Sequence, residues 1–94
     1  MDCSEILFSR HALRRMFQRG VGISEVTRIV REGEVIEEYP DDEPWPEVVL
    51  LGEVANLALH VVVGREPVTL RCVTITVYWP DLDRWDERFR HRRR

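Results

Sequence analysis

Lysine is absent from this sequence of 94 residues, so all 14 basic side chains are arginine. Cysteine is scarce, because the chain has only Cys3 and Cys72. Two cysteines do not make a disulfide framework, and we expect a reduced, cytoplasmic protein. The few histidines and cysteines show no metal-ligand spacing, so we expect no metal and no cofactor. Each of these side chains carries a planar guanidinium, which can bind a phosphate through two parallel hydrogen bonds.

Long apolar runs are also missing. The longest stretch, 48–63, is interrupted by Glu53, Asn56 and His60, which excludes a membrane-spanning helix. The first ten residues lack the apolar core of a signal peptide. A hydrophobic fraction of 44% and a charged fraction of 33% predict one domain over residues 1–94. Its last part, residues 81–94, reads as a partly flexible basic tail.

Acidic residues outnumber basic ones by 17 to 14, so the formal net charge is −3. An acidic total argues mildly against nucleic-acid binding. The charges are unevenly spread, however, because ten of the acids lie in residues 25–53. Four arginines lie in residues 10–19, and six lie in residues 84–94. This distribution favours a local phosphate site over dense coating by RNA.

Hydrophobic periodicity predicts two helices followed by strands. The first helix spans 10–19 after Ser9 as N-cap, with Ala12, Leu13, Met16 and Phe17 on one side. The second spans 25–32, with Ser24 as N-cap and Gly33 as its end. Strands are expected at 35–39, 48–52, 57–63 and 70–79, the last with strict alternation of apolar and hydroxyl side chains. We therefore predict an α+β domain with two N-terminal helices packed on a four-stranded antiparallel sheet.

The polar side of the first helix is a candidate phosphate site, formed by His11, Arg14, Arg15, Gln18 and Arg19. Several arginines on one helical stripe can bind a polyanion backbone. The alternative is an ordinary solvated helix face. The basic tail and the acidic middle have the same two interpretations, as partner surfaces or as merely solvated segments.

His60 stands among valines and leucines in the middle of a predicted strand. Its ordinary pKa of about 6.5 suits proton transfer near neutral pH. The alternative is a buried histidine bonded to the backbone or to a loop carboxylate. A hydroxyl row, Thr74, Thr76 and Tyr78, can share a sheet face with His60, although strand propensity alone also explains it.

Taken together, these residue types suit metal-free chemistry on an RNA phosphodiester. The ribose 2′-hydroxyl attacks the adjacent phosphorus, one group removes its proton and another protonates the leaving oxygen. Arginines stabilise the charge that builds on the phosphoryl oxygens.

Four segments carry a resemblance to a known family: FSRHALRRMFQRG (8–20), GEVIEEYPDD (33–42), LHVVV (59–63) and TVYWPD (76–81). In this order they resemble the small bacterial DUF4258 proteins over nearly the whole chain. The chain departs from that pattern at residues 20–23, Gly-Val-Gly-Ile, which looks like a short insertion before the second helix.

The resemblance implies a fold akin to the RelE-like and barnase-like ribonuclease toxins. It also implies a toxin role beside a small antitoxin that carries a zinc-finger segment and a DNA-binding region. The motif residues carried over are His11, Arg15, Arg19, His60 and Tyr78.

The first hypothesis is a metal-independent endoribonuclease toxin of a toxin–antitoxin pair. Its catalytic residues would be His60, His11 and Tyr78, and its phosphate-binding residues Arg15, Arg19, Arg14 and Thr76. The second hypothesis is a non-catalytic module that binds RNA or protein. A third is a structural or regulatory fragment that works only within a complex.

Overall fold

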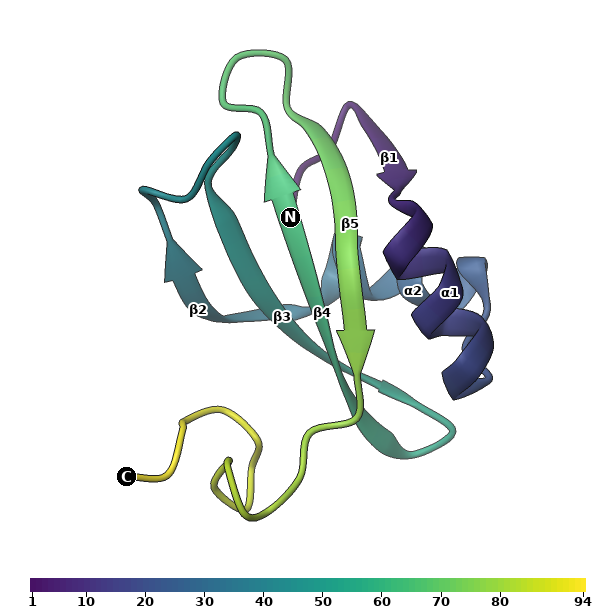
Figure 1. The fold of residues 1–94 in the computed structure, drawn as a ribbon, viewed down its shortest axis with the longest axis vertical. Coiled ribbons are helices and arrows are strands. Elements are labelled where there is room, and N and C mark those ends of the chain that lie inside the picture. The colour runs from purple at the N-terminus through teal and green to yellow at the C-terminus, as the bar shows by residue number, and fades with distance from the viewer.

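Two helices precede four of the five strands in the computed structural model, which describes residues 1–94 (Figure 1). The elements in chain order are β1 (Glu5–Phe8), α1 (Arg10–Arg19), α2 (Ile23–Glu32), β2 (Glu34–Tyr39), β3 (Glu47–Val54), β4 (Leu57–Arg65) and β5 (Arg71–Tyr78). The strands form one sheet in the order β1-β5-β4-β3-β2. The predicted α+β class is confirmed. Neither helix has the length and apolar character needed to span a membrane.

β1 makes the sheet mixed, which corrects the prediction of four antiparallel strands. The pairs β2–β3, β3–β4 and β4–β5 are antiparallel, as predicted. β1 instead pairs with β5 in parallel, with Glu5 opposite Arg71 and Phe8 opposite Thr74. A four-residue strand that pairs with the far end of the chain leaves no local turn signal, so the sequence pattern does not reveal it.

Ser9 begins α1 as predicted. Its Oγ accepts a hydrogen bond from the Ala12 N–H at 2.9 Å. The helix ends at Gly20, whose φ of 68° lies in the left-handed region that glycine adopts freely. Ser9 Oγ also donates to the Ile75 carbonyl at 3.1 Å, and the Ser9 N–H donates to the Thr74 carbonyl at 3.0 Å. The N-cap therefore also fixes α1 to β5.

α2 begins at Ile23, earlier than predicted, because Gly22 rather than Ser24 is its N-cap. The Glu25 carboxylate accepts a hydrogen bond from the Gly22 N–H at 2.9 Å. A glutamate at this position satisfies a backbone donor that the helix itself leaves free. The helix ends at Glu32, as predicted.

The hydrophobic core lies between the helices and one face of the sheet. Its fully buried members include Val26, Ile29, Val30, Leu50, Leu59, Val61, Val63 and Val77. A Cβ on Gly52 would lie only 2.5 Å from Ile29 Cγ1, so α2 packs on β3 at a distance that requires glycine there. In Figure 1, α1 lies beside β5, whereas α2 packs on β3 and β4.

The apolar side of α1 is only partly buried. Ala12 and Met16 belong to the interior, but Leu13 is 43% exposed and Phe17 is 89% exposed. The pattern that groups these four residues on one side thus overstates the buried stripe. α1 flanks an outer part of the sheet and has no second layer over it, so part of its apolar side faces solvent.

A β-bulge interrupts the alternation predicted for β5. Val62 lies opposite Thr76, but the next residue, Val63, lies opposite Thr74, which leaves Ile75 as the extra residue. Thr74 is therefore fully buried on the core side, and its Oγ1 has no hydrogen-bond partner. Beyond the bulge Val77 faces the core, so Thr76 and Tyr78 face the opposite side.

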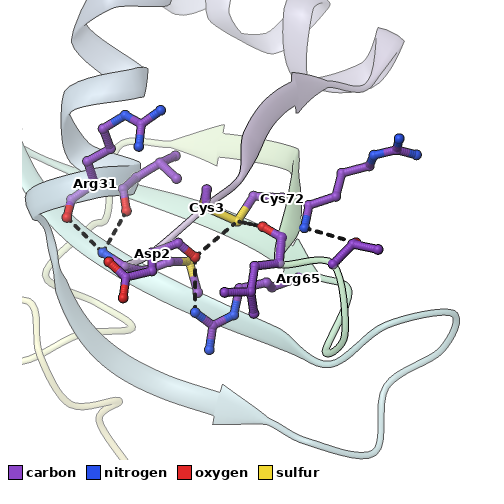
Figure 2. The surroundings of a disulfide bond; sticks show 10 residues. Asp2, Cys3, Arg31, Arg65 and Cys72 are labelled. Atoms are coloured by element: carbon purple, nitrogen blue, oxygen red, sulfur yellow. Dashed lines mark hydrogen bonds between the residues drawn. A yellow bond between two sulfur atoms is a disulfide. The ribbon is translucent and has the colours of Figure 1, made fainter.

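Cys3 and Cys72 form a disulfide, which corrects the expectation of reduced thiols (Figure 2). The bond joins the segment before β1 to the second residue of β5. Beside it, the N-terminal ammonium donates to the carbonyls of Val30 at 3.1 Å and Arg31 at 2.7 Å. These carbonyls lie at the C-terminal end of α2, where a cation is favoured by the helix dipole. The bond and the ammonium together hold the N-terminal segment across the molecule.

We expect the disulfide to contribute to stability because it closes a loop of 69 residues. Chain-entropy arguments give about 4 kcal/mol for a loop of this size as an upper figure. Replacing both cysteines (Cys3→Ala with Cys72→Ala) should therefore lower the urea midpoint, and dithiothreitol should lower that of the wild type in the same way. The matched control is dithiothreitol on the double variant, which should change nothing. A wild-type midpoint that is insensitive to reductant would contradict the bond.

Candidate functional site

Two of the three predicted hydroxyl residues share a sheet face with His60. Register places His60 opposite Tyr78 and Val62 opposite Thr76, on the face opposite the core residues Val61 and Val77. Thr74 does not belong to this face, because the bulge turns it into the core. The sequence left the register open, and the structure settles it for Thr76 and Tyr78.

His60 is fully buried and both of its ring nitrogens are engaged. Nε2 lies 2.8 Å from the Phe89 carbonyl, and Nδ1 lies 3.2 Å from the Tyr78 hydroxyl. A carbonyl can only accept, so Nε2 carries the hydrogen and Nδ1 accepts from Tyr78. Burial lowers the pKa of His60, which keeps the ring neutral, and burial raises the pKa of Tyr78, which keeps its hydroxyl protonated. This arrangement matches the alternative interpretation from the sequence, in which His60 is a buried histidine hydrogen-bonded to the backbone.

Residues 81–94, which we call the strap, cover His60. The Trp85 ring meets the His60 ring edge-on, with centroids 4.4 Å apart, and Trp85 is only 2% exposed. The guanidinium of Arg92 lies 4.5 Å from the centre of the Trp85 ring. Figure 1 shows this segment, in green to yellow, running from the end of β5 toward the β2 side of the sheet.

Ion pairs tie the strap to β2. Arg90 pairs with Glu34 at 2.9 Å, and Arg92 pairs with Glu37 at 2.9 Å. Within the strap, the Asp86 carboxylate accepts hydrogen bonds from the N–H groups of Arg88 and Arg90. The predicted basic tail is thus placed against the predicted acidic middle of the same chain.

His11 lies at the other end of the hydroxyl row. Its Nε2 is 3.1 Å from Thr76 Oγ1, in an exposed position. Thr76 and Tyr78 alternate with Val77 along β5, so their side chains are neighbours on one face. The two predicted histidines are therefore the ends of one polar row, His11, Thr76, Tyr78 and His60, which we call the polar row. One end is open to solvent and the other lies under the strap.

The arginines of α1 divide between two sides of the helix. His11, Arg15 and Arg19 follow each other at intervals of four residues, so they form one stripe that begins beside Thr76. Arg15 donates to Gln18 at 2.8 Å. Arg14 is displaced by one position from this stripe and lies toward the solvent side, so the structure does not group it with the polar row.

Two residues of the strap that cover His60 are not among those predicted from the sequence. Trp85 and Phe89 are aromatic residues within a segment that, apart from Leu82 and His91, is otherwise charged, and that isolation is a signal that the tail is anchored. Nothing local indicates where they dock, because their partner, His60, lies on β4.

Comparison with known proteins finds one family. The model of DUF4258, described as a domain of unknown function, matches residues 8–79. Neither the curated proteins nor the solved structures contain a match to this chain. The matched region runs from the last residue of β1 to just past β5, so it includes the whole polar row. The chain therefore belongs to the DUF4258 family.

Proposed function

We propose that this protein binds RNA beside α1 and cleaves its phosphodiester bonds by attack of the ribose 2′-hydroxyl. The observation that carries the proposal is the polar row, which puts two imidazoles and two hydroxyls on one face next to the arginine stripe of α1. Acid–base transfer by positioned side chains and charge stabilisation by guanidinium groups are what this reaction requires.

His11 is the proton acceptor in this proposal, because its ring is accessible while Thr76 orients it. Arg15 and Arg19 continue from His11 along the helix, where a phosphate held by their guanidinium groups would lie near the imidazole. These arginines make no ion pair with any carboxylate, so their charge is available to a phosphate.

His60 is the proton donor once the strap lifts. In the covered state its Nε2–H is spent on the Phe89 carbonyl and its Nδ1 holds the Tyr78 hydroxyl. The Arg90–Glu34 ion pair is exposed on both sides and so adds little to holding the strap. Glu37, in the other pair, is only 19% exposed, and its partner Arg92 also lies against Trp85, so Trp85 and Arg92 are the main anchors of the strap. Exposure to water returns the pKa of an imidazole toward its ordinary value. The ring can then be protonated near neutral pH and donate its proton to the leaving oxygen.

The covered state of His60 also favours the second candidate, a module that binds RNA without cleaving it. A histidine with both nitrogens bonded and no exposed surface has the features of a structural anchor. In that case the arginine stripe still holds RNA, but no pH at which the strap stays closed yields cleavage.

In the cell, the proposed role of the protein is that of a RelE-like toxin that cleaves cytoplasmic RNA. An antitoxin with a zinc-finger segment and a DNA-binding region would inhibit it. Two helices ahead of the antiparallel strands β2 to β5 support this kinship, and the parallel strand β1 departs from the fold that we expected. In a reducing cytoplasm the Cys3–Cys72 bond would open. A toxin that acts there works in its reduced form, so its cleavage of RNA should survive reduction of the bond.

Both candidates predict salt-dependent RNA binding through the α1 stripe. Replacing Arg15 and Arg19 by alanine should weaken binding of a single-stranded RNA and flatten the plot of log affinity against log salt by about 0.7 per arginine. Arg31→Ala, on the exposed side of α2, is the matched control and should leave the slope unchanged. Fluorescence anisotropy across a salt series measures both. Equal slopes for all variants would place RNA elsewhere or nowhere.

Cleavage distinguishes the two candidates. His11→Ala should slow cleavage of a labelled RNA by about 100-fold or more, which is the usual contribution of a positioned acid–base group. Since His11 is exposed, the variant should unfold at the wild-type urea midpoint. Arg31→Ala, on the exposed side of α2 and outside both the polar row and the strap, is the matched control and should not slow the reaction. No cleavage by the wild type at any pH, together with intact RNA binding, would select the binding module.

The strap should loosen as the pH falls. The groups facing His60 are the Tyr78 hydroxyl, the Phe89 carbonyl, the Glu37 carboxylate and the Arg92 guanidinium. Burial lowers the His60 pKa and the Arg92 charge acts in the same direction, against the Phe89 carbonyl and the Glu37 carboxylate, which raise it. A histidine with a lowered pKa contributes stability that is complete above its ordinary value of about 6.5 and is lost as the pH falls below it. The urea midpoint should therefore drop between about pH 7.5 and about pH 5.

The comparison for this test is His60→Gln, whose amide does not titrate. This variant will be less stable than the wild type overall, but its midpoint should vary less over the same pH range. Parallel pH profiles for the two proteins would show that His60 does not hold the strap.

A further inference from the structure

The side of α1 that faces solvent carries an apolar pair. Leu13 and Phe17 are one helical turn apart, and their exposed fractions are 43% and 89%. Phe17 has the highest exposed fraction among the large apolar side chains of the chain. Single exposed apolar residues are ordinary, but a turn-spaced pair on a helix is the spacing by which one helix meets another.

Arginines border this pair. Arg10 lies three residues before Leu13, and Arg14 lies three residues before Phe17, so each guanidinium is a surface neighbour of one apolar side chain. α1 contains no acidic residue, and none of its arginines appears in an ion pair. Arg10 and Arg14 are themselves one turn apart, so their like charges repel each other.

We propose that this outer face of α1, formed by Arg10, Leu13, Arg14 and Phe17, docks an acidic amphipathic helix of a partner protein. The apolar stripe of such a helix would cover Leu13 and Phe17, and its glutamates would meet Arg10 and Arg14 in the bidentate geometry that guanidinium and carboxylate favour. The partner would supply the negative charge that α1 lacks.

Charge decides against a second copy of this chain as the occupant. Two copies meeting through this face would bring the arginines of both helices together, which costs binding energy. RNA fits the face less well than an acidic helix, because Phe17 offers one ring on which a base can stack and Leu13 beside it offers none, whereas the apolar stripe of a helix covers both. The stripe of His11, Arg15 and Arg19 lies on a different side of α1, so this docking does not rest on the proposed RNA chemistry.

The test uses a synthetic helical peptide with leucines spaced one turn apart on one side and glutamates along both borders. Fluorescence anisotropy should show saturable binding to the full-length protein, weakened at least about tenfold by Phe17→Ser, as expected for a central aromatic contact. Val68→Ser is the matched control, because it removes an apolar side chain that is 87% exposed in a different part of the molecule. It should bind the peptide as the wild type does.

A second peptide with glutamine in place of each glutamate should bind several-fold more weakly, since only charge has changed. Amide shifts in nuclear magnetic resonance spectra should move along residues 10–17 when the acidic peptide is added. No saturable binding, equal affinity of the two peptides, or shifts confined to another surface would overturn the proposal. Displacement of the peptide by single-stranded RNA with loss on Phe17→Ser would reassign the face to nucleic acid. RNA cleavage that depends on His11 would be unaffected by any of these outcomes.

Discussion

The bulge at Ile75 is the feature on which the rest of the candidate site depends. The extra residue turns Thr74 into the core and leaves Thr76 and Tyr78 on the face of His60. It also presents the Ile75 carbonyl to the side chain of Ser9, which is the N-cap of α1. A bulge commonly re-aims side chains near a functional site, and here it also fixes the start of the helix.

The start of α1 in turn sets the position of His11. Ser9 is hydrogen-bonded to β5 through both its backbone and its side chain. His11, two residues later, is therefore placed within hydrogen-bond distance of Thr76. Without the extra residue in β5, continued alternation would place Thr76 on the core side with Thr74, and His11 would lose its partner. The polar row is thus a consequence of backbone geometry and not only of residue type.

The sequence predicts the elements whose signals are local. Ser9 and Gly20 mark the ends of α1, and the β-branched runs mark the antiparallel strands. It fails where the partner is distant: β1, the disulfide and the strap each join segments that are far apart in the chain. His60 stands out in the sequence as a histidine within an apolar strand, yet its burial depends on Trp85, whose docking position no periodicity encodes.

The strap also changes what the net charge means. The acidic middle and the basic tail, which the sequence presents as separate partner surfaces, neutralise each other through Glu34 with Arg90 and Glu37 with Arg92. Two of the ten acids in residues 25–53 and two of the six arginines in residues 84–94 are therefore paired with each other within the molecule. α1 is different, because its four arginines have no acid on the helix and no ion pair elsewhere. A chain with a formal charge of −3 consequently presents a positive helix, and any anionic ligand should be drawn to α1 first.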